Sequence, residues 1–101
     1  MDKEGDMALG FSESNATTLH PSLSFTGRVP SDPANKMESV ARIFTAKGSA
    51  TDASRWGDYS SMVIDPSDDC TFWYVNQYIK TTGPAIDFHT RVASLKFPTC
   101  Q

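Results

Sequence analysis

The sequence predicts an all-β protein built of antiparallel meanders, on three observations. Six short segments alternate apolar and polar side chains or are rich in β-branched and aromatic residues, which is typical of strands. Turn-forming residues separate these segments, and nothing has the period of a long amphipathic helix. The expected strands cover residues 6–13, 22–29, 38–46, 58–65, 71–79 and 88–97. A helix over residues 37–46 is the one alternative that intrinsic propensity allows.

Two of the three expected strands of the first half carry apolar side chains or glycine along one side. Such alternation places these positions on the same face of a strand. The positions are Met7, Leu9 and Phe11 in the first segment and Leu23, Phe25 and Gly27 in the second, while the third segment carries Val40, Ile43 and Phe44.

The expected strand over residues 71–79 is the most apolar segment of the second half. It is apolar on both faces, and such a strand is covered on both sides when sheets are stacked. Its aromatic residues Trp73, Tyr74 and Tyr78 could form an exposed platform, but packing between sheets is the expected role. The apolar residues of the flanking strands are Tyr59, Met62, Val63 and Ile64 before it, and Val92, Leu95 and Phe97 after it.

Length and charge limit the classes of protein to which the chain can belong. Its 101 residues make one domain at most, and the net charge is −3 with no cluster of lysine and arginine. Nucleic acid and anionic membrane surfaces are therefore not expected as partners, because both require concentrated positive charge. No apolar run approaches the roughly 20 residues of a membrane span. Residues 1–6 are polar and acidic and lack the features of a secretory signal.

The two cysteines predict a disulfide. If residues 71–79 and 88–97 form a hairpin about Gly83-Pro84, then Cys70 and Cys100 lie opposite each other at its open end. Cross-strand neighbours are within reach of disulfide geometry. The alternative is two free thiols; two cysteines without nearby histidines make only half a zinc site, so no metal is expected. A disulfide implies an oxidising compartment and hence export.

Several runs of residues resemble the C-terminal part of exported bacterial proteins of the sialidase-like, BNR-repeat β-propeller family. The segment from Ser67 to Trp73 departs from that family's Asp-box, Ser-x-Asp-x-Gly-x-Thr-Trp, because it has no glycine and its tryptophan falls one position early. The resemblance covers nearly the whole chain. Its runs are Arg55-Trp56-Gly57-Asp58-Tyr59-Ser60-Ser61, Asp65-Pro66, Asp69-Cys70-Thr71-Phe72-Trp73-Tyr74 and Thr90-Arg91-Val92-Ala93-Ser94-Leu95-Lys96-Phe97-Pro98-Thr99-Cys100, with Met7-Ala8-Leu9-Gly10-Phe11-Ser12 and Pro21-Ser22-Leu23-Ser24-Phe25-Thr26-Gly27-Arg28 upstream.

The resemblance implies that the chain is a fragment holding the last one to two blades of a propeller. Residues 1–50 would then be part of the penultimate blade, and residues 51–101 the C-terminal blade with the disulfide-closed hairpin. A four-stranded blade would need one more strand from elsewhere in the protein, so this chain would expose sheet edges. The signal for export would lie upstream of Met1, and the location would be extracellular or periplasmic.

The loop entering the strand at residues 58–65 supplies the candidate ligand-binding residues Arg55, Trp56, Asp58 and Tyr59. Arginine, aspartate and tyrosine side chains bind sugars and carboxylates, and tryptophan stacks on a pyranose ring. The resemblance implies that this loop lies on the ligand-binding face of the propeller. The alternative is structural: Arg55 and Asp58 pair to brace the loop, and Trp56 packs between blades.

The candidates for the carboxylate pair that glycoside hydrolysis requires are Asp58, Asp65, Asp68 and Asp69. The last three fall in one turn, where capping of backbone amides is expected and calcium binding is the alternative. His20 and His89 lie far apart in the sequence, and no serine sits in a nucleophile pattern. No catalytic residue, metal ion or cofactor is therefore expected.

These observations favour a non-catalytic part of an exported β-propeller scaffold that binds an extracellular glycan or protein. Its expected partners are the remaining blades of the full-length protein or further copies of itself. One alternative function is part of a sialidase-type glycoside hydrolase. Another is a small β domain that self-associates.

Overall fold

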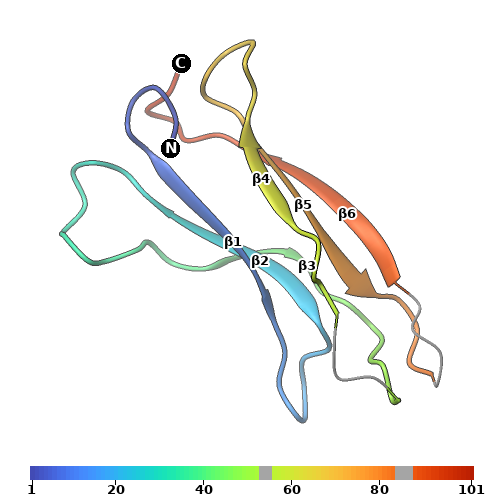
Figure 1. Cartoon of the computed structure of the whole chain (residues 1–101). Helices are drawn as coiled ribbons and strands as arrows, with labels where there is room; N and C mark the ends of the chain where they lie inside the picture. The colour runs from blue at the N-terminus through green and yellow to red at the C-terminus, as the bar shows by residue number, and fades with distance from the viewer. Residues whose placement is uncertain (53–55, 84–87) are drawn as a thin grey trace.

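The fold is all-β, as the sequence predicts (Figure 1). The computed structural model describes residues 1–52, 56–83 and 88–101, and these contain six strands and no helix. Because a strand occupies residues 41–44, the helical alternative for residues 37–46 is wrong. The strands are β1 (Met7–Glu13), β2 (Ser22–Arg28), β3 (Ala41–Phe44), β4 (Ser61–Ile64), β5 (Phe72–Ile79) and β6 (Phe88–Leu95).

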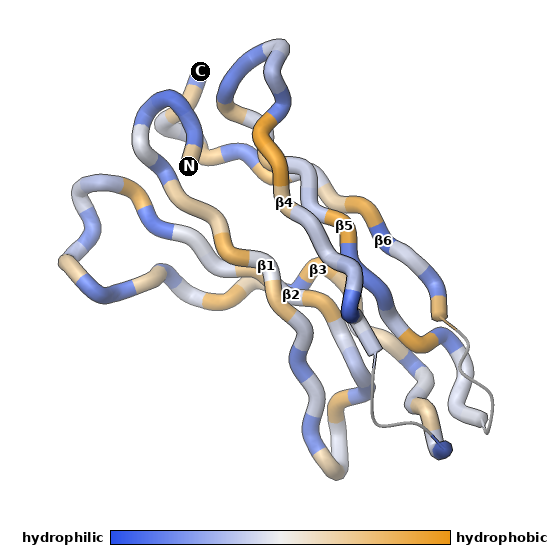
Figure 2. Tube along the Cα trace, in the orientation of Figure 1, coloured by the Kyte–Doolittle hydropathy of each residue, from blue (hydrophilic) through white to orange (hydrophobic). Residues whose placement is uncertain are grey.

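The strands form two three-stranded antiparallel sheets, each a simple meander. One has the order β1-β2-β3 and the other β4-β5-β6, so the sheets fall on either side of residue 50. The middle strands β2 and β5 pack against each other, which stacks the sheets face to face. The Cα atoms span 45 × 29 × 17 Å, a thickness that fits two layers about 10 Å apart. Figure 2 shows the hydrophobic stretches within the strands and mostly hydrophilic turns at their ends.

Strand β5 contributes Phe72, Tyr74 and Ile79 to the core. Phe72, Tyr74 and Asn76 are buried between the sheets, whereas Trp73 points to the opposite face and is 42% exposed. The prediction of a packing role is thus right for Tyr74, while the side chain of Trp73 lies outside the core. The buried apolar side chains are Leu23, Ala46, Cys70, Phe72, Tyr74, Ile79, Phe97 and Cys100.

Glycines on the first sheet allow the aromatic rings of the second to approach its backbone. A Cβ atom on Gly10 would lie 2.5 Å from the ring of Tyr74, and one on Gly27 would overlap the ring of Phe97. These distances are shorter than any van der Waals contact, so a side chain at either position displaces a ring or separates the sheets. The ring contacts therefore set the spacing of the two layers.

Because Gly10 and Gly27 pack against the second sheet, the apolar side of β1 faces away from that sheet. Gly10 faces the second sheet, so the alternate residues Met7 and Leu9 point away from it, and Leu9 is 54% exposed. The sequence predicts correctly that these residues share a side, but that side is not the buried one. The inner side of β1 instead carries small residues, which leave room for Tyr74.

The disulfide between Cys70 and Cys100 is present, as predicted, with Cα atoms 5.6 Å apart. The hairpin register differs from the expected one: Phe72 pairs with Leu95, so Cys70 would face Phe97 on an uninterrupted ladder. A turn closed by the Cys100 N–H and the Phe97 carbonyl brings the second sulfur back to the first. Closing a loop with a separation of 30 residues stabilises a fold by about 3–4 kcal/mol in the chain-entropy model.

The contact between Gly10 and Tyr74 makes a direct prediction. We expect Gly10→Ala to destabilise the protein by about 1–3 kcal/mol, because the added methyl group overlaps the Tyr74 ring. Urea unfolding followed by tryptophan fluorescence measures the change. Gly83→Ala is the matched control, since a Cβ atom there would meet nothing within 4 Å. Equal stability of the two variants would contradict the proposed role of Gly10.

Candidate functional site

The candidate ligand-binding loop enters β4 at the side of the second sheet that lies near β1. Trp56 and Gly57 are half-buried, whereas Asp58 and Tyr59 are exposed. Tyr59 is 82% exposed, so its ring is open to solvent. Arg55, the fourth predicted binding residue, lies outside the described residues, and its expected ion pair with Asp58 therefore stays a prediction.

Gly57 holds this loop against both sheets. Its φ of +72° is a left-handed conformation that favours glycine. Its N–H donates to Oε1 of Gln77 on β5 at 3.1 Å. A Cβ atom on Gly57 would lie 3.5 Å from Oδ1 of Asn76 and 3.6 Å from Oγ of Ser12, so the loop backbone passes close to β5 and β1. The neighbouring Trp56 and Asp58 are thus attached to an anchored backbone position.

A polar network lies beneath Gly57 and joins the two sheets. Asn76 is 3% exposed, and its Nδ2 donates to the hydroxyl of Tyr74 at 2.6 Å and to Oγ of Ser12 at 3.1 Å. Burial raises the pKa of Tyr74, and the hydrogen bond from Asn76 partly opposes that rise. The phenol therefore stays neutral at physiological pH. A satisfied buried network of this kind orients its members, and here it lies below the loop.

The exposed part of the loop carries an aromatic ring and a carboxyl group. Tyr59 is exposed, and so is Asp58. The structure thus brings together Trp56, Asp58 and Tyr59 in one described loop, as their adjacency in the sequence requires.

The acidic turn between β4 and β5 uses its carboxylates as caps. Oδ1 of Asp65 accepts the N–H of Ser67, and Oδ2 accepts the indole N–H of Trp73 at 3.0 Å. Oδ1 of Asp68 accepts the N–H groups of Cys70 and Thr71. The predicted capping role is confirmed for these two aspartates.

These hydrogen bonds lower the pKa of both carboxyl groups. For Asp68 the hydroxyl and N–H of Thr71 are the main causes, followed by the N–H of Cys70, and Lys96 adds a contact at 3.2 Å. For Asp65 the indole of Trp73 is the main cause. A carboxylate held ionised by several donors is a poor general acid at neutral pH. Neither residue therefore fits the proton donor that glycoside hydrolysis needs.

A basic and aromatic cluster at the β3 and β6 side of the sheets was not singled out from the sequence. The guanidinium of Arg91 lies 4.5 Å from the ring centroid of Phe44, which in turn lies 4.5 Å from the ring of Tyr78. The ring of His89 lies 5.6 Å from that of Tyr78, in a tilted arrangement. Alternation along β6 places Arg91 and His89 on one face, but the contact with Phe44 depends on how the sheets stack.

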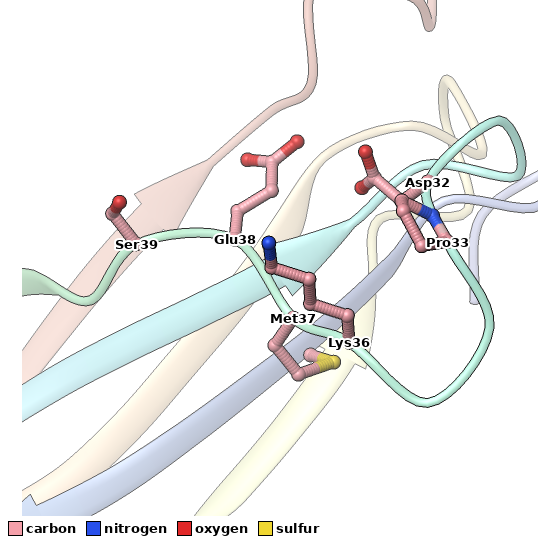
Figure 3. A pocket seen from close by; sticks show the side chains of 6 residues that line it. All are labelled: Asp32, Pro33, Lys36, Met37, Glu38 and Ser39. Carbon is pink, nitrogen blue, oxygen red and sulfur yellow. The ribbon is translucent and has the colours of Figure 1, made fainter.

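A hollow of about 600 Å³ lies apart from the candidate loop, on the long connection between β2 and β3 (Figure 3). The carboxylates of Asp32 and Glu38 extend from the same loop as Lys36 and Met37. Oδ2 of Asp32 accepts the N–H of Val29, so this carboxylate also shapes its own turn. The sequence did not indicate this hollow, because its lining residues form no motif.

The fold and the loop define a class: a disulfide-bonded, two-layer all-β chain with an anchored surface loop. Within the described ranges, no helix is long and apolar enough to cross a membrane, and no group of three or more histidine, cysteine or acidic side chains is placed to hold a metal ion. Neither a family model, nor a curated protein, nor a solved structure matches the chain. Its function must therefore be argued from its own residues.

The pKa of Asp68 predicts how stability depends on pH. An aspartate in an unfolded chain titrates near pH 4, and the folded state holds Asp68 ionised below that. The stability from Asp68 is therefore present above about pH 4 and is lost as the pH falls further. We expect Asp68→Asn to flatten the loss of stability between pH 5 and pH 2, measured by urea unfolding at each pH. Asp69→Asn is the control in the same turn, and an equal flattening by both would contradict this assignment.

Proposed function

We propose that this chain is a non-catalytic part of an exported scaffold of stacked β-sheets, of the β-propeller kind, that binds an extracellular glycan or protein. One observation carries the proposal: the two stacked sheets leave apolar side chains exposed on their outer faces. A further sheet of the same assembly is the partner whose flat, pleated surface complements such a face.

The outer face of the second sheet supports this proposal most directly. The register places Val63 opposite Trp73, and Val75 opposite Val92, all on the side away from the first sheet. Val63 is 55% exposed and Val92 is 63% exposed. Neighbouring apolar side chains on one exposed face mark an interaction surface.

The outer face of the first sheet has the same character, and both sheets have open edges. Leu9 and Met7 point outward from β1. In the described ranges β1 and β3 each pair on one side only, as do β4 and β6. Unpaired edges favour the addition of a strand or of a neighbouring sheet. A fourth strand added at one of these edges would extend each three-stranded meander to a four-stranded blade.

Two further features support the exported, binding part of the proposal. The Cys70–Cys100 disulfide fits an oxidising compartment, and an extracellular or periplasmic location would provide one. The exposed ring of Tyr59 beside Asp58 gives the loop a surface suited to a sugar. The capping roles of Asp65 and Asp68 weigh against the glycosidase alternative, because these carboxylates already hold the turn.

An outer-face variant tests the scaffold proposal. We expect Val63→Thr combined with Val92→Thr to reduce binding of a hydrophobic dye and concentration-dependent association, measured by fluorescence and sedimentation velocity. Stability should change by less than about 1 kcal/mol, because both side chains are exposed and threonine retains the β-branched shape.

Val40→Thr is the matched control for the double variant, because Val40 is 56% exposed but lies outside the strands. A wild-type chain that stays monomeric and binds no dye would contradict the proposal. So would an equal effect of the control variant.

A variant of Tyr59 tests the binding loop. We expect Tyr59→Ala to weaken glycan binding about tenfold, the equivalent of a stacking contact of about 1–1.5 kcal/mol, whereas Tyr59→Phe retains it. A glycan array of the full-length protein followed by titration calorimetry measures the change. Hydrolysis of a sialoside that Asp58→Asn abolishes would contradict the proposal and favour the glycosidase alternative.

A further inference from the structure

Two aspartates at the start of the chain are buried, although nothing in the sequence marks them. Asp6 is 0% exposed and Asp2 is 7% exposed. Both belong to a tight turn, which the Asp2 N–H closes on the Asp6 carbonyl at 3.0 Å. Buried carboxylates are rare unless a cation or several hydrogen bonds compensate the charge.

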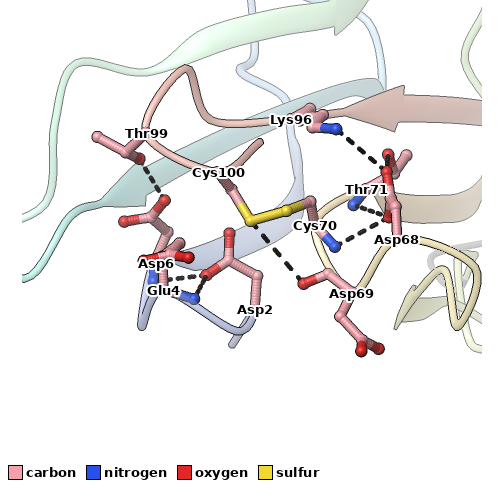
Figure 4. Close-up of a disulfide and its surroundings, with 10 residues drawn as sticks. All are labelled: Asp2, Glu4, Asp6, Asp68, Asp69, Cys70, Thr71, Lys96, Thr99 and Cys100. Carbon is pink, nitrogen blue, oxygen red and sulfur yellow. Dashed lines mark hydrogen bonds and ion pairs between the residues drawn. A yellow bond between two sulfur atoms is a disulfide. The ribbon is translucent and has the colours of Figure 1, made fainter.

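Each aspartate uses one carboxylate oxygen in hydrogen bonds. Oδ1 of Asp2 accepts the N–H of Glu4 at 3.0 Å and that of Asp6 at 2.9 Å. Oδ2 of Asp6 accepts the hydroxyl of Thr99 at 2.5 Å. Figure 4 shows both carboxylates beside the disulfide, with Thr99 reaching Asp6 from the C-terminal turn.

The second oxygen of each carboxylate is buried and has no hydrogen-bond partner in the described residues. These atoms are Oδ2 of Asp2 and Oδ1 of Asp6. The ion pairs of the described part of the chain, Arg42 with Glu13 and Lys96 with Asp68, include neither residue. Leaving a buried polar atom unpaired costs about 1–3 kcal/mol, and more when the group carries a charge. Two such atoms in one turn therefore lower the stability of the fold. A bound cation would remove this free-energy cost by pairing with both oxygens.

We propose that Asp2 and Asp6 hold a calcium ion. Ca²⁺ takes carboxylate and carbonyl oxygens in flexible geometries, whereas Mg²⁺ requires near-octahedral geometry and keeps several waters. The pair supplies two carboxylates, with backbone carbonyls of the turn and water for the remaining positions. Because only two acidic side chains take part, the dissociation constant falls in the range of about 10⁻⁴–10⁻³ M that extracellular calcium modules show.

Calcium at this position would join the two ends of the chain. The N-terminal turn also contacts the second sheet, since the Lys3 N–H donates to the Asp69 carbonyl at 3.0 Å. Asp6 contacts Thr99, which precedes the cysteine of the disulfide. The ion would therefore add its binding free energy to the same junction that the disulfide closes.

Thermal unfolding of the 101-residue chain in EDTA and in CaCl₂ tests the proposal. With a dissociation constant near 1 mM, we expect 10 mM CaCl₂ to raise the Tm by about 5–10 °C. Sodium chloride at matched ionic strength should produce a smaller shift. Equilibrium dialysis of the wild-type chain should give one bound calcium ion.

Two variants assign the ion to the site. Asp2→Asn keeps an oxygen that can accept the same two N–H groups, and Asp6→Asn keeps an oxygen that can accept the hydroxyl of Thr99. We expect both variants to lose the rise in Tm that calcium causes. Glu4→Gln is the matched control, because Glu4 lies in the same turn and is exposed, and it should retain the response.

Two results would overturn the proposal. The first is a wild-type Tm that calcium raises no more than sodium chloride does. The second is the absence of bound calcium in dialysis, a measurement that does not depend on how the variants fold.

Discussion

The close approach of aromatic rings to glycines between the two sheets is the contact on which the rest of the structure depends. Tyr74 lies against Gly10 and Phe97 against Gly27, so the layers meet at backbone distance. This stacking buries the Asn76 network and positions Gly57 over it. It also turns the larger side chains of β1 away from the core, since only a strand with small inner residues can lie beneath the Tyr74 ring. The position of the candidate loop and the exposure of the apolar outer faces both follow from these contacts between rings and glycines.

The second organising feature is the junction where both chain ends meet the acidic turn. The disulfide joins Cys70, two residues before β5, to the C-terminal turn, and Asp68 caps the same point through the N–H groups of Cys70 and Thr71. The N-terminal turn attaches to it through Lys3. Chain ends usually fray, because few contacts hold them. Here covalent and polar contacts replace the apolar contacts that so small a domain cannot supply in number.

The two proposals concern different parts of the molecule and depend on different physics. The scaffold proposal depends on apolar area that the stacked sheets leave uncovered, above all Val63, Trp73 and Val92. The calcium proposal depends on charge that the fold buries without compensation at Asp2 and Asp6. Either can fail without affecting the other. Together they describe a disulfide-bonded chain whose outer faces associate and whose ends are secured by covalent and ionic contacts.

The sequence by itself determined the features that depend on local order. Alternation and the enrichment in β-branched and aromatic residues predicted all six strands, the turn residues predicted the caps made by Asp65 and Asp68, and the expected hairpin predicted that the two cysteines pair. Only the tertiary structure decided which side of β1 is buried, because alternation defines two sides and the opposing sheet selects one. It also decided that a turn at Phe97 brings Cys100 back to Cys70, that Arg91 lies over Phe44, and that Asp2 and Asp6 are buried. Those contacts join residues distant in the chain, and burial depends on neighbours that no local pattern specifies.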